Sequence, residues 1–227
     1  KNILSKKIEW HSQRDWYSFG KPITSEAFVF LAEKISRIIK FTFFSTKKVL
    51  ALDLDNTLWG GIIGDDGPKN IKIGDETAEG RIFSEIQSYF KMIKERGILL
   101  TIVSKNEKKL ALEGFKNKKN FFKLSDFVSM RINWKNKSEN ILSIAKELNL
   151  GLDSFVFIDD NPSEREEVRK RLLNVSVPEL GSNPENYIKI INSHDYFNIN
   201  SKISEEDKKR TVFYQTDLIR KKIEKKS

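Results

Sequence analysis

The chain has 227 residues, of which 38% are hydrophobic and 32% are charged, as is typical of a soluble globular protein. It has no cysteine, which excludes disulfides, thiolate metal sites and cysteine nucleophiles. Its histidines, His11 and His194, are far apart in the sequence, so a histidine-based zinc site or catalytic triad is not expected. Carboxylates, hydroxyls and lysines remain as catalytic groups, and they favour a hard cation such as Mg²⁺.

The charge balance is basic, with 41 lysines and arginines against 32 aspartates and glutamates. Such a balance would attract nucleic acid, membrane phosphate or an acidic protein. Most lysines fall singly on predicted helix surfaces and the chain has no nucleic-acid-binding motif, so we interpret them as solvating charges and expect no nucleic-acid partner. No apolar stretch could span a bilayer, and the N-terminus lacks the apolar core of a signal peptide, so we expect a cytoplasmic protein without membrane insertion.

Residues 1–46 are predicted to form a helical segment that leads into the first strand. Residues 1–23 carry no clear pattern, but Thr24 and Ser25 are good N-caps for a helix. The apolar positions that follow recur at helical spacing: Phe28, Leu31, Ile35 and Ile38. Because the sequence begins with Lys1 rather than methionine, we interpret this segment as the candidate end of an upstream domain.

Several apolar runs are predicted as buried strands, and the first extends from Val49 to Asp53. The later runs are ILLTIVS ending at Ser104, the weaker FFKLS ending at Ser125, SFVFIDD ending at Asp160, and VSVPE near Glu179. Continuous apolar strands that alternate with helices are typical of a parallel sheet covered on both faces. The sequence therefore predicts an α/β fold.

Helical patterns lie between these strands. One helix, which Gly97 is expected to stop, has these apolar positions: Ile82, Phe83, Ile86, Phe90 and Ile93. A second, ending before Gly151, has these: Ile141, Leu142, Ala145 and Leu148. Asn161 followed by Pro162 is typical of the N-cap and first position of a third helix.

We predict a catalytic domain over residues 47–197 and a charged tail over residues 198–227. The tail has a predicted helix from Ser204 and a lysine-rich end, KKIEKKS. We interpret it as a surface helix or linker toward a C-terminal domain that this sequence does not contain.

Polar residues cluster where the predicted strands end. Asp53 and Asp55 follow the first strand, Ser104 ends the second, and Asp159 and Asp160 end the SFVFIDD run. Sites in open parallel sheets lie at the carboxyl ends of the strands. We therefore expect these side chains to share one site.

The two aspartates after the first strand are expected to divide two roles. Residues two apart in a strand point to the same side, so Asp53 and Asp55 can address one substrate. One carboxylate can attack a phosphorus atom while the other moves the proton of the leaving oxygen and later of water. A cation, a lysine and a hydroxyl would complete such a site. The chain offers Asp159 and Asp160 for the metal, Lys137 as the lysine and Ser104 as the hydroxyl.

The order DLDNT, VSKN, a lysine and IDD resembles the haloacid dehalogenase (HAD) superfamily of aspartate-nucleophile phosphotransferases. The longer strings DLDNTLWGG, NWKNK, LNLGLDS and FIDDNPSER resemble its FkbH-like branch, subfamily IIIC, over roughly Lys47 to Gln215. The resemblance implies a HAD-like (Rossmannoid) fold with Mg²⁺ as cofactor. It also implies that Asp53 becomes an aspartyl phosphate and that Asp55 is the general acid and base.

The resemblance implies further roles at matching positions. Ser104 and Lys137 would hold the phosphoryl group, and Asp159 would bind Mg²⁺ together with Asp53 and the carbonyl of Asp55. The phosphate-binding set also contains these residues: Leu54, Asp55 and Lys105. The expected surroundings of the site are as follows: Asp160 near the metal, Thr57 orienting the nucleophile loop, Asn106 at the rim, and Trp59 as an anchor packed on the sheet or a ring facing the substrate.

Superfamily members often carry a cap domain inserted after the first or second motif. Here the interval from Leu58 to Leu100 holds only a predicted hairpin, LWGGIIGDDGPKNIKIG, and one helix, so we expect a short flap and no large cap. Gly60 and Gly61 would give the flap backbone freedom, and Asp65 and Asp66 are interpreted as turn residues at its tip. An open site would suit a large or carrier-bound substrate.

The chain departs from the FkbH-like pattern at Leu54. The best-known members of that branch pass a glyceryl group from 1,3-bisphosphoglycerate to an acyl carrier protein, and a cysteine, commonly between the two aspartates, carries the thioester. We therefore predict a Mg²⁺-dependent phosphatase or phosphotransferase of a small phosphorylated metabolite. Glyceryl or acyl loading onto an acyl carrier protein and a non-catalytic scaffold are the alternatives; a receiver domain would show the opposite order of motifs.

Overall fold

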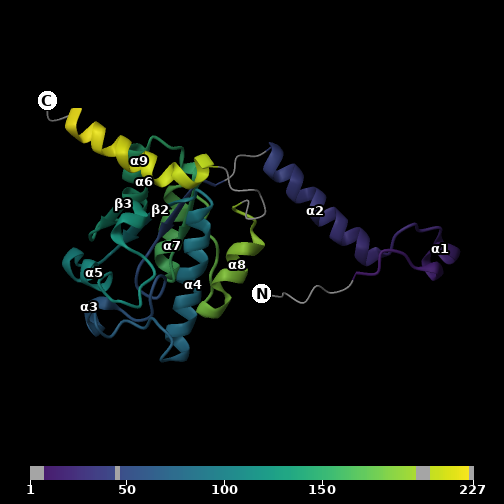
Figure 1. The fold of residues 1–227 in the computed structure, drawn as a ribbon, viewed down its shortest axis with the longest axis horizontal. Helices are drawn as coiled ribbons and strands as arrows, with labels where there is room; N and C mark the ends of the chain where they lie inside the picture. Colours follow the sequence, from purple (N-terminus) through teal and green to yellow (C-terminus); the bar gives the residue numbers. More distant parts are fainter. Residues whose placement is uncertain (1–7, 44–46, 198–204, 225–227) are drawn as a thin grey trace. The chain divides into compact units, whose positions relative to one another are not determined.

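The computed structural model describes residues 8–43, 47–197 and 205–224 (Figure 1). The chain divides into two compact units, Lys1–Ser45 and Thr46–Ser227. The three-part division predicted from the sequence stays a prediction, and the parts of the predicted tail at residues 198–204 and 225–227, including Ser204, lie outside the described residues.

The N-terminal unit contains α1 (Gln13–Phe19) and α2 (Ser25–Phe43). The predicted cap is confirmed, because the Thr24 hydroxyl accepts a hydrogen bond of 3.1 Å from the backbone N–H of Ala27. Helix α1 was not predicted; its signals are the N-cap Ser12 and the C-cap Gly20, whose φ of 63° is in the left-handed region.

The second unit is built on a parallel sheet in the order β3-β2-β1-β4. The strands are β1 (Val49–Leu52), β2 (Leu99–Ser104), β3 (Phe127–Ile132) and β4 (Phe155–Ile158). Strand β1 pairs with β2 on one side and with β4 on the other. The chain adds β2 and β3 on one side of β1 and then crosses to place β4 on the other side. The order of the strands therefore reverses between β1 and β4, and open α/β sheets place their sites at such a reversal.

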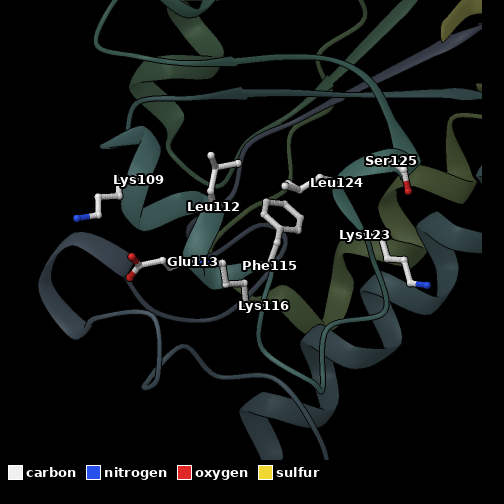
Figure 2. Close-up of a pocket in the computed structure, with 8 residues that line it drawn as sticks. All are labelled: Lys109, Leu112, Glu113, Phe115, Lys116, Lys123, Leu124 and Ser125. Atoms are coloured by element: carbon white, nitrogen blue, oxygen red, sulfur yellow. The ribbon is translucent and has the colours of Figure 1, made fainter. Parts of the chain in front are cut away.

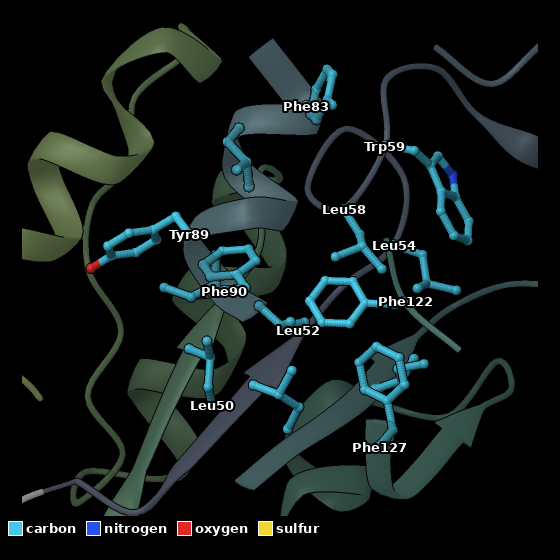
Figure 3. Packing of buried hydrophobic residues seen from close by; sticks show 14 of the residues in the cluster. Leu50, Leu52, Leu54, Leu58, Trp59, Phe83, Tyr89, Phe90, Phe122 and Phe127 are labelled. Atoms are coloured by element: carbon cyan, nitrogen blue, oxygen red, sulfur yellow. The ribbon is translucent and has the colours of Figure 1, made fainter. Parts of the chain in front are cut away.

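Helices cover both faces of this sheet, as predicted. Leu50 and Leu52 of β1 point into a core cluster with α4 (Ala78–Glu95), α5 (Lys108–Gly114) and α8 (Tyr187–Ser193), part of which Figure 3 shows. Val49 and Ala51 point into a second cluster with α6 (Lys137–Leu148), α7 (Pro162–Arg171) and α9 (Glu205–Glu224). Adjacent strand residues point to opposite faces, so the continuous apolar sequence of β1 is buried on both sides.

Two of the predicted strands are wrong. The FFKLS run is a loop followed by a 3₁₀ turn, Leu124–Asp126, and the strand is the next segment, FVSMRI of β3. The VSVPE run makes only one parallel bridge, between Ser176 and Val156 of β4. Pro178 has no N–H to continue that ladder. Further 3₁₀ turns occur at Leu152–Ser154 and Pro184–Asn186.

The segment between β1 and α4 is held close to the domain. Instead of a regular hairpin it has one antiparallel bridge, Gly60 with Lys72, and a short helix, α3 (Ile63–Asp66), where a turn was expected at Asp65 and Asp66. A side chain at Gly60 would collide with Phe83, because its Cβ would lie 2.7 Å from that ring. Gly60 therefore allows close packing rather than motion, and no separate cap domain is present in the described part of this interval.

The C-terminal helix α9 packs on the domain. Leu218 is buried in the cluster with α6, and the Gln215 side chain donates hydrogen bonds of 2.8 Å and 3.3 Å to the carbonyls of Ser125 and Phe127.

None of the helices in the described ranges is long and apolar enough to cross a membrane.

We predict that Leu218→Ala lowers the free energy of unfolding by about 2–5 kcal/mol, because it removes buried apolar atoms and leaves a cavity. Urea unfolding followed by circular dichroism measures this change. The matched control is Ile219→Ala, because Ile219 is 60% exposed and its loss should cost less than about 0.5 kcal/mol. Equal small effects at the two positions would contradict a stabilising role of α9.

Candidate active site

The predicted carboxylates come together because β1 and β4 are neighbours in register. Leu52 pairs with Ile158, so Asp53 and Asp159 follow their strands at the same level of the sheet. The N–H of Asp53 donates a 3.0 Å hydrogen bond to the carbonyl of Ile158, which continues the ladder into the site. Both aspartates are buried, and Asp160 beside them is partly buried.

Lys137 places a buried positive charge between two of these carboxylates. It is the first residue of α6, and its ammonium lies 2.7 Å from Asp53 Oδ1 and 2.7 Å from Asp159 Oδ2. The side chain is only 2% exposed. Burial by itself would lower the pKa of Lys137, but the charges of Asp53 and Asp159 outweigh it and raise that pKa above its ordinary value. Lys137 therefore stays protonated and pairs with both acids.

Three carboxylates form a cluster that fits a divalent cation. Asp53, Asp159 and Asp160 each offer an oxygen, and these atoms all lie within 4.8 Å of one another. One ammonium does not balance the charge of three carboxylates. Burial raises the pKa of Asp160 to about 6, and the charge of Asp53 is the second cause. The same two causes raise the pKa of Asp159. Asp53 Oδ1 is buried and accepts no well-directed hydrogen bond from the described residues, despite the nearby ammonium. Such an oxygen-only, electron-rich set is typical of Mg²⁺ sites.

The loop after β4 is fixed by residues from other elements. The hydroxyl of Thr57, predicted to orient the nucleophile loop, accepts a 3.1 Å hydrogen bond from the N–H of Asp160 and so joins the β1 and β4 loops. Arg165 of α7 is also buried and donates to the carbonyls of Asp159 and Asp160 at 2.9 Å and 2.6 Å. We did not predict this role for Arg165; its signal was a charged residue four positions after the N-cap Asn161, inside the FIDDNPSER string.

The second aspartate of the motif, Asp55, is held by neutral donors. Its Oδ1 accepts hydrogen bonds from the Trp59 indole at 2.9 Å and from the N–H of Ile63 at 3.1 Å, and its Oδ2 accepts one from the Asn106 side chain at 2.9 Å. Burial is the largest influence and raises the pKa of Asp55, although these donors oppose it. The environment of Asp55 thus differs from that of Asp53, which lies beside an ammonium.

Of the two side chains that donate to Asp55, Asn106 lies deeper than predicted, whereas Trp59 takes one of the two positions predicted for it. Asn106, expected at the rim, is only 6% exposed, and its amide also donates to Ser104 Oγ at 3.1 Å. Trp59 is fully buried and packs edge-to-face on Phe115, which is the anchor position of the two considered. The contact of the Ile63 backbone with Asp55 was not predicted, because sequence patterns do not report backbone donors in irregular loops.

The remaining predicted phosphate-binding residues are placed as follows. Ser104 ends β2, is fully buried and is linked to Asp55 through Asn106. Leu54 is fully buried in the apolar cluster, so only its backbone could contact a ligand (Figure 3). The ammonium of Lys105 forms a salt bridge with Glu164, with a distance of 2.7 Å between Lys105 Nζ and Glu164 Oε1. Phosphate binding by each of these three residues stays a prediction.

A separate pocket of about 550 Å³ lies beside α5, and Figure 2 shows its lining residues. Leu112, Phe115 and Leu124 supply its apolar surface, and lysines 109, 116 and 123 supply basic groups. None of the predicted site residues lines it. The pocket is therefore distinct from the carboxylate cluster.

No protein-family model and no curated protein matches the chain. Among solved structures, the chain is similar to the N-terminal part of the protein BF1531 from Bacteroides fragilis, which contains a phosphatase domain and was crystallised in complex with Mg. The TM-score is 0.75, the sequences are 37% identical, and the match covers 85% of this chain and 52% of that one. The HAD-like fold class is confirmed. The chain spans about half the length of its structural relative.

We predict that Lys137→Met lowers the free energy of unfolding by about 3–5 kcal/mol in buffer without divalent cations, because Asp53 and Asp159 would stay buried without their cation. Lys146→Met on the exposed face of the same helix is the matched control and should change stability by less than about 0.5 kcal/mol. Urea unfolding of the two variants makes the comparison. A similar small effect for both would show that the buried ion pairs do not stabilise the fold.

Proposed function

We propose that the chain is a Mg²⁺-dependent phosphatase that acts through an aspartyl phosphate on Asp53. The observation that carries this proposal is the Lys137 ammonium held between Asp53 and Asp159, beside a cluster of three carboxylates. Similarity to a phosphatase domain that was crystallised in complex with Mg supports it.

Each residue would contribute one part of a phosphate monoester hydrolysis. The Asp53 carboxylate forms a bond to phosphorus as the bond to the ester oxygen breaks, and Asp55 gives its proton to that leaving oxygen. Asp55 then takes a proton from the water that attacks the aspartyl phosphate, which releases phosphate and restores both acids. Lys137 and Ser104 hold the phosphoryl oxygens.

The carboxylates of Asp53 and Asp159, with the carbonyl of Asp55, would hold Mg²⁺, and Asp160, whose oxygen lies within 4.8 Å of those of the other two acids, would bind it through water. When bound, the ion supplies positive charge that offsets the repulsion between a carboxylate and a phosphate dianion. The chain's own contribution is a rigid, largely buried set of oxygens at the carboxyl edge of β1 and β4.

We propose a small phosphorylated metabolite as substrate. Assignment to the FkbH-like branch is part of this proposal, but the glyceryl relay of that branch lacks its thiol here: the chain has no cysteine and Leu54 is buried in the core. Acyl loading onto an acyl carrier protein is therefore the second candidate. Intact-mass measurement of a carrier protein incubated with the chain and 1,3-bisphosphoglycerate tests it, since a glyceryl adduct would favour loading over hydrolysis.

We predict that the chain releases inorganic phosphate from at least one member of a panel of phosphorylated metabolites and aryl phosphates, and only with Mg²⁺ present. Asp53→Asn should reduce turnover to background because the nucleophile is lost, and Asp55→Asn should reduce it by about 10²–10⁴-fold because proton transfer is lost. Colorimetric phosphate release measures both. Full activity of Asp53→Asn would refute the assignment, and an inactive wild type would favour a scaffold.

We predict that 10 mM MgCl₂ raises the melting temperature of the wild type, because a ligand of the folded state stabilises it by about 2.7 kcal/mol when present at 100 times its dissociation constant. Asp159→Asn should abolish this rise, since it removes a ligand from the cluster. Asp153→Asn, at an exposed position before β4, should retain the rise and serves as the control. Thermal denaturation followed by circular dichroism gives the three values.

A further inference from the structure

We propose that Trp59 is a positioning residue for proton transfer and that Asp55 delivers its proton from Oδ2. This inference rests on the proposed function and goes beyond it, because it assigns the proton to one oxygen and names the side chain that sets this choice.

The two oxygens of Asp55 differ in the acceptor positions that they have free. A carboxylate oxygen offers about two acceptor positions. At Oδ1, both are filled, by the indole N–H of Trp59 at 2.9 Å and by the backbone N–H of Ile63 at 3.1 Å. A proton could bind Oδ1 only if one of these hydrogen bonds broke.

Neither donor to Oδ1 can easily turn away. The Trp59 ring is fully buried, and its centroid lies 5.4 Å from that of Phe115 in an edge-to-face contact. The Ile63 amide belongs to the first residue of α3, and the Ile63 side chain is fully buried. Oδ1 is therefore kept as an acceptor.

The other oxygen of Asp55, Oδ2, has a free acceptor position for a proton and lies on the side of Ser104, the serine proposed to hold the phosphoryl group. Among the described residues, only Asn106 donates to Oδ2, at 2.9 Å, which leaves one acceptor position. The same amide donates to Ser104 Oγ at 3.1 Å, so Oδ2 lies on the Ser104 side of Asp55. A proton on Oδ2 can thus reach a leaving oxygen whose phosphoryl group is held by Ser104.

The step balances as follows. The Oδ2–H bond breaks as a new O–H bond forms on the leaving oxygen, which also receives the electron pair of its bond to phosphorus. In the second half of the reaction, Oδ2 takes back one proton from the attacking water. Trp59 takes no proton in either step and acts only by holding Oδ1.

The test compares aryl phosphates whose leaving groups range from good, as in 4-nitrophenyl phosphate, to poor, as in phenyl phosphate. A poor leaving group depends more on proton donation than a good one. Trp59→Phe keeps an aromatic ring but removes the N–H donor. We expect this variant to lose about tenfold more kcat/KM on phenyl phosphate than on 4-nitrophenyl phosphate. A tenfold difference is a part of the rate increase of about 10²–10⁴-fold that a general acid supplies.

Phe90→Leu is the control, because Phe90 is fully buried in the same apolar cluster and takes part in none of the three hydrogen bonds that hold the Asp55 carboxylate. It should lower kcat/KM by one common factor across the series. If Trp59→Phe does not fold, replacing the indole of Trp59 by benzothiophene keeps its size and removes only the donor. An equal loss across the series for the donor-free variant would overturn the inference while leaving the phosphatase proposal intact. Turnover by Asp53→Asn, or none by the wild type, would overturn both.

Discussion

The arrangement of the site depends on one buried contact, the Lys137 ammonium between Asp53 and Asp159. Removing a charge from water costs several kcal/mol, and a partner at short range must offset that cost. The contact therefore requires the end of β1, the end of β4 and the start of α6 to meet. The Phe157 ring of β4, whose centroid is 5.7 Å from the ammonium, covers the same group. Strand register and helix placement are thus linked through one side chain.

Helix α7 stabilises both sides of this contact. Its Glu167 accepts a 3.1 Å hydrogen bond from the N–H of Ser138, which fixes the first turn of α6 next to Lys137. Its Arg165 binds the carbonyls of Asp159 and Asp160, which fixes the loop after β4. The same helix therefore positions the cation and the acids that pair with it, although α7 supplies none of the predicted catalytic groups.

The parts of the fold that could be predicted are those whose burial is continuous. β1 and β4 are buried at every position and are followed by acids, so their location and the meeting of these acids could be predicted from the sequence. The edge strand β3 was missed because Ser129 and Arg131 interrupt its apolar pattern; both bind Glu147 of α6. The contacts of Trp59 and Asn106 with Asp55 could not be predicted either, because they join irregular loops whose backbone path no periodicity reports.

The contrasting surroundings of Asp53 and Asp55 explain how one short motif can supply two different acids. Asp53 lies 2.7 Å from the buried ammonium of Lys137. Asp55 is surrounded by neutral N–H donors, and burial raises its pKa despite them. Pairs of acids whose environments differ in this way are suited to divided roles. Under the proposed mechanism, the acid beside the cation attacks and the acid without one carries the proton. The fold creates this difference at the end of β1, where Asp53 meets Lys137 of α6 and Asp55 meets the indole of Trp59.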